Sequence, residues 1–128
     1  MILRLSAFSM ILAIISATAT ATAIAAAQER TQPAAGALLR GLDKFNGSVV
    51  DIELSVGQTI KFDRLNVTLT ECLYPVGNPV GDAYAGLQIT EEGNSGEAFS
   101  GWMIASSPAL SAMEHSRYDI WVLRCIIS

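Results

Sequence analysis

The alternation of apolar and polar side chains from Leu65 to Tyr74 is the feature that most limits what this chain can fold into. The apolar positions are Leu65, Val67, Leu69 and Leu73, and they are separated by Asn66, Thr68, Thr70 and Cys72. A repeat of two residues places successive side chains on opposite faces of an extended chain, whereas a helix needs a repeat near 3.6. The segment therefore predicts a β-strand with one buried face.

Several other short segments have strand-like patterns and are separated by glycine, proline or Asn-Gly turn signals. They are Ala37–Leu42, Ser48–Ser55, Ile60–Phe62, Asp82–Thr90, Phe99–Ser106 and Tyr118–Ile127. The first is short enough to form a helical turn instead, and we favour a strand. Regularly spaced strands without an alternating strand-helix pattern predict an all-β fold. We expect a small β-sandwich or partly open barrel of about seven strands with one short helix.

The last third of the chain predicts strand, helical turn and strand. Phe99–Ser106 carries no charge, which is typical of a strand buried on both faces. Ser107 and Pro108 suit the start of a helix, and Ala109–Glu114 would supply one or two turns. Tyr118–Ile127 is apolar on both faces, so we expect a central strand.

The N-terminus has the pattern of a secretory signal peptide. Arg4 precedes an apolar stretch, and small residues at Ala25–Ala27 form a cleavage site. We expect residues 1–27 to be the signal peptide, residues 28–36 a flexible tether, and residues 37–128 a single β domain. A periplasmic location follows, with no stable membrane insertion once the signal is cleaved. Removing Arg4 lowers the net charge from −4 to −5, and an acidic domain without a basic cluster disfavours a nucleic-acid partner.

Two cysteines remain in the exported chain, and an oxidising compartment favours a disulfide between Cys72 and Cys125. The face assignments create a difficulty. Cys72 lies on the threonine face of its strand, whereas Cys125 alternates in step with Trp121 and Leu123. Either both faces are covered, or a β-bulge changes the parity of a strand.

The residue types of a hydrolase triad occur only around His115, with Ser106, Ser107 or Asp119. No Gly-x-Ser-x-Gly motif accompanies them, so a helix-end histidine is the simpler interpretation and a hydrolase is a remote alternative. The acidic residues of the Glu91–Glu97 turn lack calcium-loop spacing. The sequence therefore predicts a non-enzymatic domain with no catalytic residues, no cofactor and no metal.

The aromatic and methionine residues offer a possible contact surface. We expect Trp102, Met103, Met113 and Tyr84 to contribute to it, because the Phe99–Ala112 segment is unusually apolar. The predicted partner is another protein of the cell envelope. The alternative is a small-molecule or glycan binder, with a pocket bordered by Tyr84, Trp102 and the Pro75–Gly81 loop.

Five motifs resemble a family of exported Gram-negative bacterial proteins that share a domain of unknown function. The motifs are Leu39–Lys44, Ser55–Gln58 followed by Phe62, Thr70–Cys72, FSGWMIASSPAL at Phe99–Leu110 and YDIWVLRC at Tyr118–Cys125. The resemblance covers residues 38–125. It implies a periplasmic address and a single small domain, and it supplies no activity and no catalytic residues.

Overall fold

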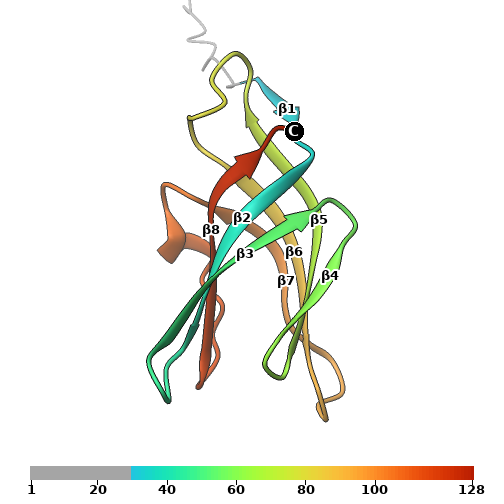
Figure 1. The fold of residues 1–128 in the computed structure, drawn as a ribbon, viewed down its shortest axis with the longest axis vertical. Coiled ribbons are helices and arrows are strands. Elements are labelled where there is room, and N and C mark those ends of the chain that lie inside the picture. Colours follow the sequence, from blue (N-terminus) through green and yellow to red (C-terminus); the bar gives the residue numbers. More distant parts are fainter. Residues whose placement is uncertain (1–29) are drawn as a thin grey trace, which may run out of the picture.

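The computed structural model describes residues 30–128, and in this part of the chain eight strands form two antiparallel sheets that pack face to face (Figure 1). The elements are β1 (Thr31–Pro33), β2 (Gly36–Asp43), β3 (Ser48–Ser55), β4 (Thr59–Phe62), β5 (Leu65–Pro75), β6 (Tyr84–Glu91), β7 (Glu97–Ile104), the 3₁₀ helix η1 (Pro108–Ser111) and β8 (Tyr118–Ile126). The larger sheet has the order β1-β5-β6-β7, with β4 also paired to β5, and the smaller has the order β3-β2-β8. The predicted all-β fold is confirmed, as a sandwich and not as a closed barrel.

The core lies between the two inner faces and follows the predicted alternation. Leu65, Val67 and Leu69 of β5 are fully buried and face Leu39 of β2 and Ile120 of β8 within one cluster. The side chains between the β5 leucines and valine are only partly covered. Burial of one face of each sheet therefore holds the two layers together.

Two β-bulges bring the cysteines onto the inner faces. The pairing of β5 with β6 shifts between Leu69 and Glu71, so Thr70 is an extra residue. The pairing of β2 with β8 shifts in the same way, and Leu123 is the extra residue there. Each bulge reverses the parity of the residues that follow it. Cys72 and Cys125 are consequently buried, and they form a disulfide between the two sheets, as the sequence predicts.

A short strand lies within the predicted tether. Thr31–Pro33 pairs with Leu73–Pro75 of β5, and the Gln32 side chain donates a hydrogen bond of 2.6 Å to the Tyr74 hydroxyl. Ala34 N–H also donates to the Cys72 carbonyl, at 2.8 Å. The polar composition of this segment suggested flexibility, but its backbone pairs with the C-terminal end of β5. The predicted signal peptide, and the first two tether residues, lie outside the described residues.

The last two strands lie at sheet edges. Within residues 30–128, β8 pairs only with β2 and β7 only with β6, which corrects the central position predicted for Tyr118–Ile127 and the burial on both faces predicted for Phe99–Ser106. Trp121, on the outward face of β8, lines a hollow together with Pro108 and Ala112, so the η1 segment partly shields an apolar outward face. The helix itself is a single 3₁₀ turn, because residues after Ser111 adopt extended backbone. Within residues 30–128, no helix is long and apolar enough to cross a membrane.

Candidate functional site

The four predicted contact residues divide between the core and the surface. Met103 and Met113 are only 2% and 4% exposed, so their assignment to a contact surface is wrong. Met103 pairs with Ala85 and shares its inward direction. Trp102, the next residue along β7, is 44% exposed, and Tyr84 is half-buried. The alternation along β7 thus separates neighbours that the apolar composition had grouped together.

Trp102 and Tyr84 belong to an apolar patch on the outer face of the larger sheet. Paired residues of antiparallel strands point to the same side. The register places Pro33 beside Leu73, Leu73 beside Tyr84, and Tyr84 beside Ile104, so one apolar row crosses four strands. Trp102 lies diagonally beside this row. We call these five residues the Trp102 face.

The indole of Trp102 lies against Gly86. A β-carbon built at Gly86 would be 3.7 Å from the ring of Trp102 and would collide with Thr70 Oγ1 on the other side. Gly86 therefore lets the bulge residue and the indole approach the same point of the sheet. Thr70, the residue of the bulge that orients Cys72 inward, and the indole of Trp102 thus both lie next to Gly86.

The Trp102 face has the composition of a binding surface and contains none of the acid, base or nucleophile pairs that catalysis needs. Its side chains are proline, leucine, isoleucine and two aromatics, with Glu71 exposed nearby. Such a surface can bury apolar groups of another protein, and its two aromatic rings can also stack on sugars. Leu110, exposed on η1, is a further apolar residue that the predicted surface omitted.

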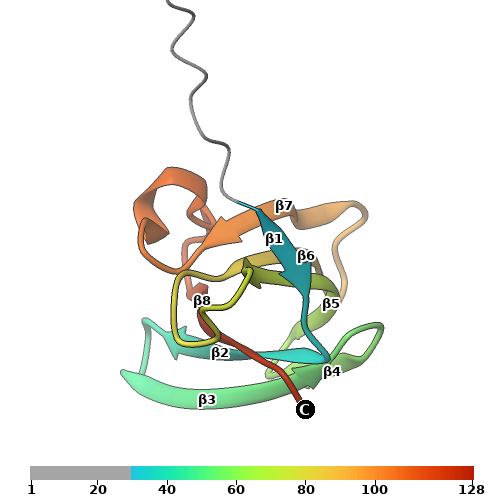
Figure 2. The same cartoon turned by 90° about the horizontal axis from the view of Figure 1, so that it is seen from above.

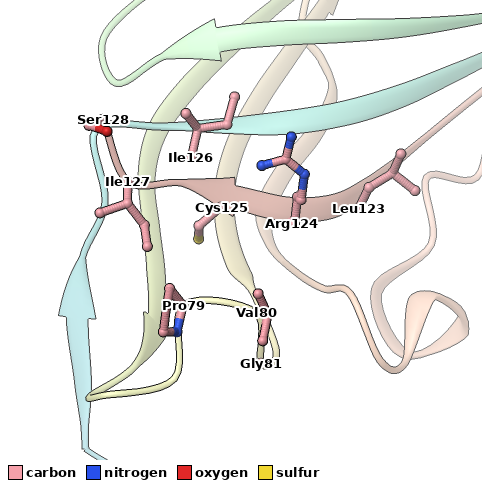
Figure 3. Close-up of a pocket in the computed structure, with 9 residues that line it drawn as sticks. All are labelled: Pro79, Val80, Gly81, Leu123, Arg124, Cys125, Ile126, Ile127 and Ser128. Carbon is pink, nitrogen blue, oxygen red and sulfur yellow. The ribbon is translucent and has the colours of Figure 1, made fainter.

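A hollow that lies elsewhere does not match the predicted pocket. Its volume is about 560 Å³, and Figure 3 shows Pro79, Val80 and Gly81 across it from the end of β8. The Pro75–Gly81 loop thus borders a hollow as predicted, but its partners are Leu123–Ser128 instead of Tyr84 and Trp102. A second hollow of about 370 Å³ lies between η1 and Asp119–Trp121. The described hollows therefore give no support to a pocket bordered by the two aromatics.

His115 is fixed by hydrogen bonds at both ring nitrogens. Nδ1 accepts from the backbone N–H groups of Arg117 and Tyr118, at 3.0 and 3.1 Å. Because Nδ1 is an acceptor, the ring hydrogen sits on Nε2, which donates to Glu91 Oε2 at 2.8 Å. This hydrogen bond holds the pKa of the Glu91 carboxyl below its ordinary value. Neither nitrogen is then available to take a proton from a nucleophile.

The hydroxyl of Ser106, one serine of the hypothetical triad, has another partner. Ser106 Oγ donates to Asp82 Oδ2 at 2.5 Å, and Ser107 N–H donates to the Ile104 carbonyl at 3.1 Å. Partial burial by itself would raise the pKa of Asp82, but the side chain and N–H of Ser106 and the N–H of Ala83 together hold it below its ordinary value. Asp119 lines the hollow beside η1. The structure does not bring His115 together with any predicted triad partner.

A partly buried ionic network joins the ends of three strands and was not predicted from the sequence. Arg117 donates to both oxygens of Asp43, with Nη2 2.9 Å from Oδ2, and also lies 3.2 Å from Asp63. The Arg117 hydrogen bonds lower the pKa of Asp43. Tyr118 is fully buried and donates its hydroxyl hydrogen to Asp63. Burial, and then this hydrogen bond, raises the pKa of Tyr118. No spacing in the sequence indicates these partners.

Residues 30–128 contain no group of three or more histidine, cysteine, aspartate or glutamate side chains placed to hold a metal ion. The Arg117 network links Asp43 at the end of β2, Asp63 after β4 and Tyr118 of β8, and the His115 pair links Glu91 of β6 to the segment before β8. Among the described residues, the Trp102 face is the surface best suited to contact another molecule.

Comparison with known proteins places the chain among bacterial proteins of unknown activity. The model of the family "Uncharacterized protein conserved in bacteria (DUF2155)" matches residues 37–125. The chain is also 30% identical over 87 residues to "Uncharacterized protein RP359" of Rickettsia prowazekii (strain Madrid E), an alignment that covers 66% of this chain and 56% of the relative. The chain thus spans just over half the length of that relative. No solved structure matches it. Because the matched region takes in most of the sequence, the chain belongs to this family of uncharacterised bacterial proteins.

Proposed function

We propose that this chain is an exported, non-enzymatic interaction module that binds another protein of the bacterial envelope through the Trp102 face. The observation that carries the proposal is the exposure of Trp102 beside an apolar row that crosses four strands. A large aromatic side chain left half exposed on a rigid sheet is typical of the anchors that supply most of the energy at protein interfaces.

Its position on a sheet makes the Trp102 face well suited to recognition. Trp102 is held by the backbone of β7 and by contact with Gly86, and its neighbours Tyr84 and Leu73 belong to long paired strands. A partner that binds here does not have to order a loop, so little conformational entropy opposes binding. The patch is also continuous, which separates it from the isolated apolar side chains that every protein surface carries.

A binding role fits the chemistry of the remaining polar groups better than catalysis does. His115 has hydrogen-bond partners at both nitrogens, and Ser106 is bound to Asp82. These groups lie within structural networks and do not converge on a common point. The proposal therefore assigns them to stability.

An exported location is part of the proposal and is supported by the cysteines. The buried Cys72–Cys125 pair joins the two sheets, and such pairs persist in oxidising compartments. The predicted signal peptide would deliver the chain to the periplasm. Mass spectrometry of unreduced protein from fractionated cells tests this: the expected result is an oxidised pair in the periplasmic fraction, and two free thiols would contradict it.

The binding proposal is tested by co-purification of tagged variants from crosslinked cells. Trp102→Glu places a charge on the Trp102 face, and Val80→Glu places the same charge on a valine that is 92% exposed and lies outside that face. We expect the first variant to recover at least about tenfold less of a specific envelope protein, since one anchor residue commonly contributes 2 kcal/mol or more. Equal recovery with both folded variants would contradict the proposal.

A second candidate function, glycan binding, rests on one observation. The indole of Trp102 and the phenol of Tyr84 lie on the same face of adjacent strands, where two rings could stack on successive sugars. Trp121→Phe leaves Trp102 as the only tryptophan, so its fluorescence would report such a ligand directly. A saturable change on titration with soluble peptidoglycan fragments would favour this function, and an unchanged spectrum would leave the protein-binding proposal.

A further inference from the structure

The outer edge of β3 has no partner strand in residues 30–128. β3 is the terminal strand of the smaller sheet, and β2 is its only neighbour. The two strands pair over eight consecutive positions without a register shift, from Ser48 opposite Asp43 to Ser55 opposite Gly36. Figure 2 shows β3 along the outside of the molecule, with no other described strand beyond it. A row of backbone donors and acceptors without a bulge is therefore available on this side, except at Ser55, whose N–H donates to the Gln58 side chain.

The other free edges each carry a feature that discourages pairing. β1 is three residues long and contains Pro33, and β4 is four residues long and contains Lys61. β7 has a register shift and a glycine, Gly101, at a φ of 155°. β8 has the bulge at Leu123, and its edge faces η1 and the Pro79–Gly81 loop. Short length, proline, charged side chains, bulges and cover are the means by which edges avoid pairing. β3 is long and has no proline, lysine or bulge; its charged residues are Asp51, which pairs with Arg40, and Glu53.

The first half of β3 is also apolar on both faces. Ile52 and Leu54 point into the core, so Val50 points to the inner side and Val49 to the outer side. Both extend past the packed core, and they are 56% (Val49) and 44% (Val50) exposed. A strand that pairs with this edge would cover apolar surface on both faces of the sheet at once.

The charge along this edge favours a neutral partner strand. Asp51 is the charged residue of Ser48–Ile52, and Arg40 on β2 donates to both of its carboxylate oxygens, at 2.8 and 3.2 Å. The guanidinium lowers the pKa of Asp51 through these hydrogen bonds, so the pair is fully ionised near neutral pH and has no net charge. A second copy of the chain would therefore meet no local electrostatic repulsion at this edge. A strongly charged partner strand would gain no electrostatic attraction from it.

Among antiparallel self-pairings that involve at least five residues of β3, one register avoids opposed like charges; an axis at Glu53, for example, would place two glutamates opposite each other. Opposite residues must share a face, so the two-fold axis must pass through a residue and its own copy. An axis at Asp51 would place two aspartates opposite each other, and an axis at Ile52 would place Asp51 opposite Glu53. An axis at Val50 places Val50 opposite Val50 and Asp51 opposite Val49. That register covers the exposed valines and avoids opposed like charges.

We propose that β3 is a self-association edge, through which a second copy of this chain pairs in antiparallel fashion about Val50. The result is a two-fold dimer with a continuous six-stranded sheet. The edge is separate from the Trp102 face, so the proposal is independent of the proposed function and leaves that face free on both copies.

Position-specific disulfide trapping tests the register. In the proposed dimer, two cysteines introduced by Val50→Cys lie opposite each other, within the Cα separation of about 4.4–6.8 Å that a disulfide needs. Glu53→Cys is the control on the same strand, because residue 53 and its copy would be six residues apart, about 20 Å. We expect rapid dimer crosslinking of purified Val50→Cys and little from Glu53→Cys or Val80→Cys. Equal rates for all three variants would overturn the proposal.

The oligomeric state provides a second measurement that does not depend on introduced cysteines. Sedimentation of the wild-type chain should show a concentration-dependent dimer, and Val50→Lys should weaken it at least tenfold because two lysines would then face each other. Val80→Lys, the matched control, should leave the dimer unchanged. A wild-type chain that stays monomeric at about 100 μM would refute self-association. Crosslinking of Val50→Cys in cells to a different protein, with a monomeric purified chain, would also refute it.

Discussion

Reduction of the Cys72–Cys125 disulfide should destabilise this domain more than almost any single surface substitution. The bridge joins residues that are 53 positions apart, and it links β5 of one sheet to β8 of the other. Opening it releases a closed loop in the unfolded chain, and the loop-entropy relation gives about 4 kcal/mol for this length. A domain of this size typically has about 5–15 kcal/mol of stability in total.

The corresponding change in thermal stability is large. At about 4–8 °C for each kcal/mol in a domain of this size, the midpoint of thermal unfolding should fall by about 16–32 °C. Reduction leaves both sulfur atoms in place, so it isolates the crosslink from packing. The double variant Cys72→Ala, Cys125→Ala removes the sulfurs as well and should be at least as unstable.

Urea unfolding of the oxidised and reduced chains, followed by tryptophan fluorescence, measures the difference in the free energy of unfolding. A loss of about 3–5 kcal/mol would agree with the loop calculation. A loss below about 1 kcal/mol would refute the reasoning, because it would mean that the unfolded chain gains little freedom when the bridge opens.

Three further predictions concern single side chains. Gly86→Ala should lower the free energy of unfolding by about 1–3 kcal/mol, because the alanine β-carbon would collide with the Thr70 hydroxyl. In a urea double-mutant cycle, adding Thr70→Ala should restore most of the lost stability. Arg117 lowers the pKa of Asp43, so the stability that the Asp43 carboxylate contributes is complete above about pH 4 and is lost as the pH falls through its lower, folded-state pKa. The urea midpoint of Asp43→Asn should therefore drop less than that of the wild type between pH 6 and pH 2.5. An equal drop in both proteins would contradict this prediction. His115→Ala should cost about 1–3 kcal/mol of stability, since two backbone N–H groups lose their acceptor, and unchanged thermal unfolding would contradict a structural histidine.

The strands were largely predictable from the sequence because one face of each is buried. Ser48–Ser55 was predicted with its observed bounds, and Leu65–Tyr74 differs from β5 by one residue. The alternation of apolar and polar residues predicts a strand whenever one face of its sheet is buried. It does not reveal which strands are neighbours, so the apolar β8 was assigned to the centre of a sheet although it lies at an edge.

The features that the sequence did not predict depend on contacts between segments that are far apart in the chain. The disulfide was predictable from composition and compartment, but choosing between covered faces and a bulge required the pairing of β5 with β6 and of β2 with β8. Strand β1 was missed because its stability comes from Tyr74 and Cys72, more than thirty residues away. The Asp43–Arg117 pair spans 74 positions for the same reason.

Two of the four predicted contact residues lie on the candidate site. Trp102 and Tyr84 do share an outward face, whereas Met103 and Met113 fill the core. Strand parity alone could have separated Trp102 from Met103, since adjacent residues of a strand point in opposite directions. The contribution of Pro33 could not have been foreseen, because it depends on the pairing of β1 with β5.

A photo-crosslinking amino acid placed at position 102 in living cells tests the Trp102 face most directly. The same amino acid at position 80, a more exposed site outside the Trp102 face, is the control. We expect position 102 to capture one envelope protein reproducibly and position 80 to capture none of it. Capture of the same proteins at both positions, or of none at position 102 in a folded and oxidised chain, would contradict a contact surface centred on Trp102.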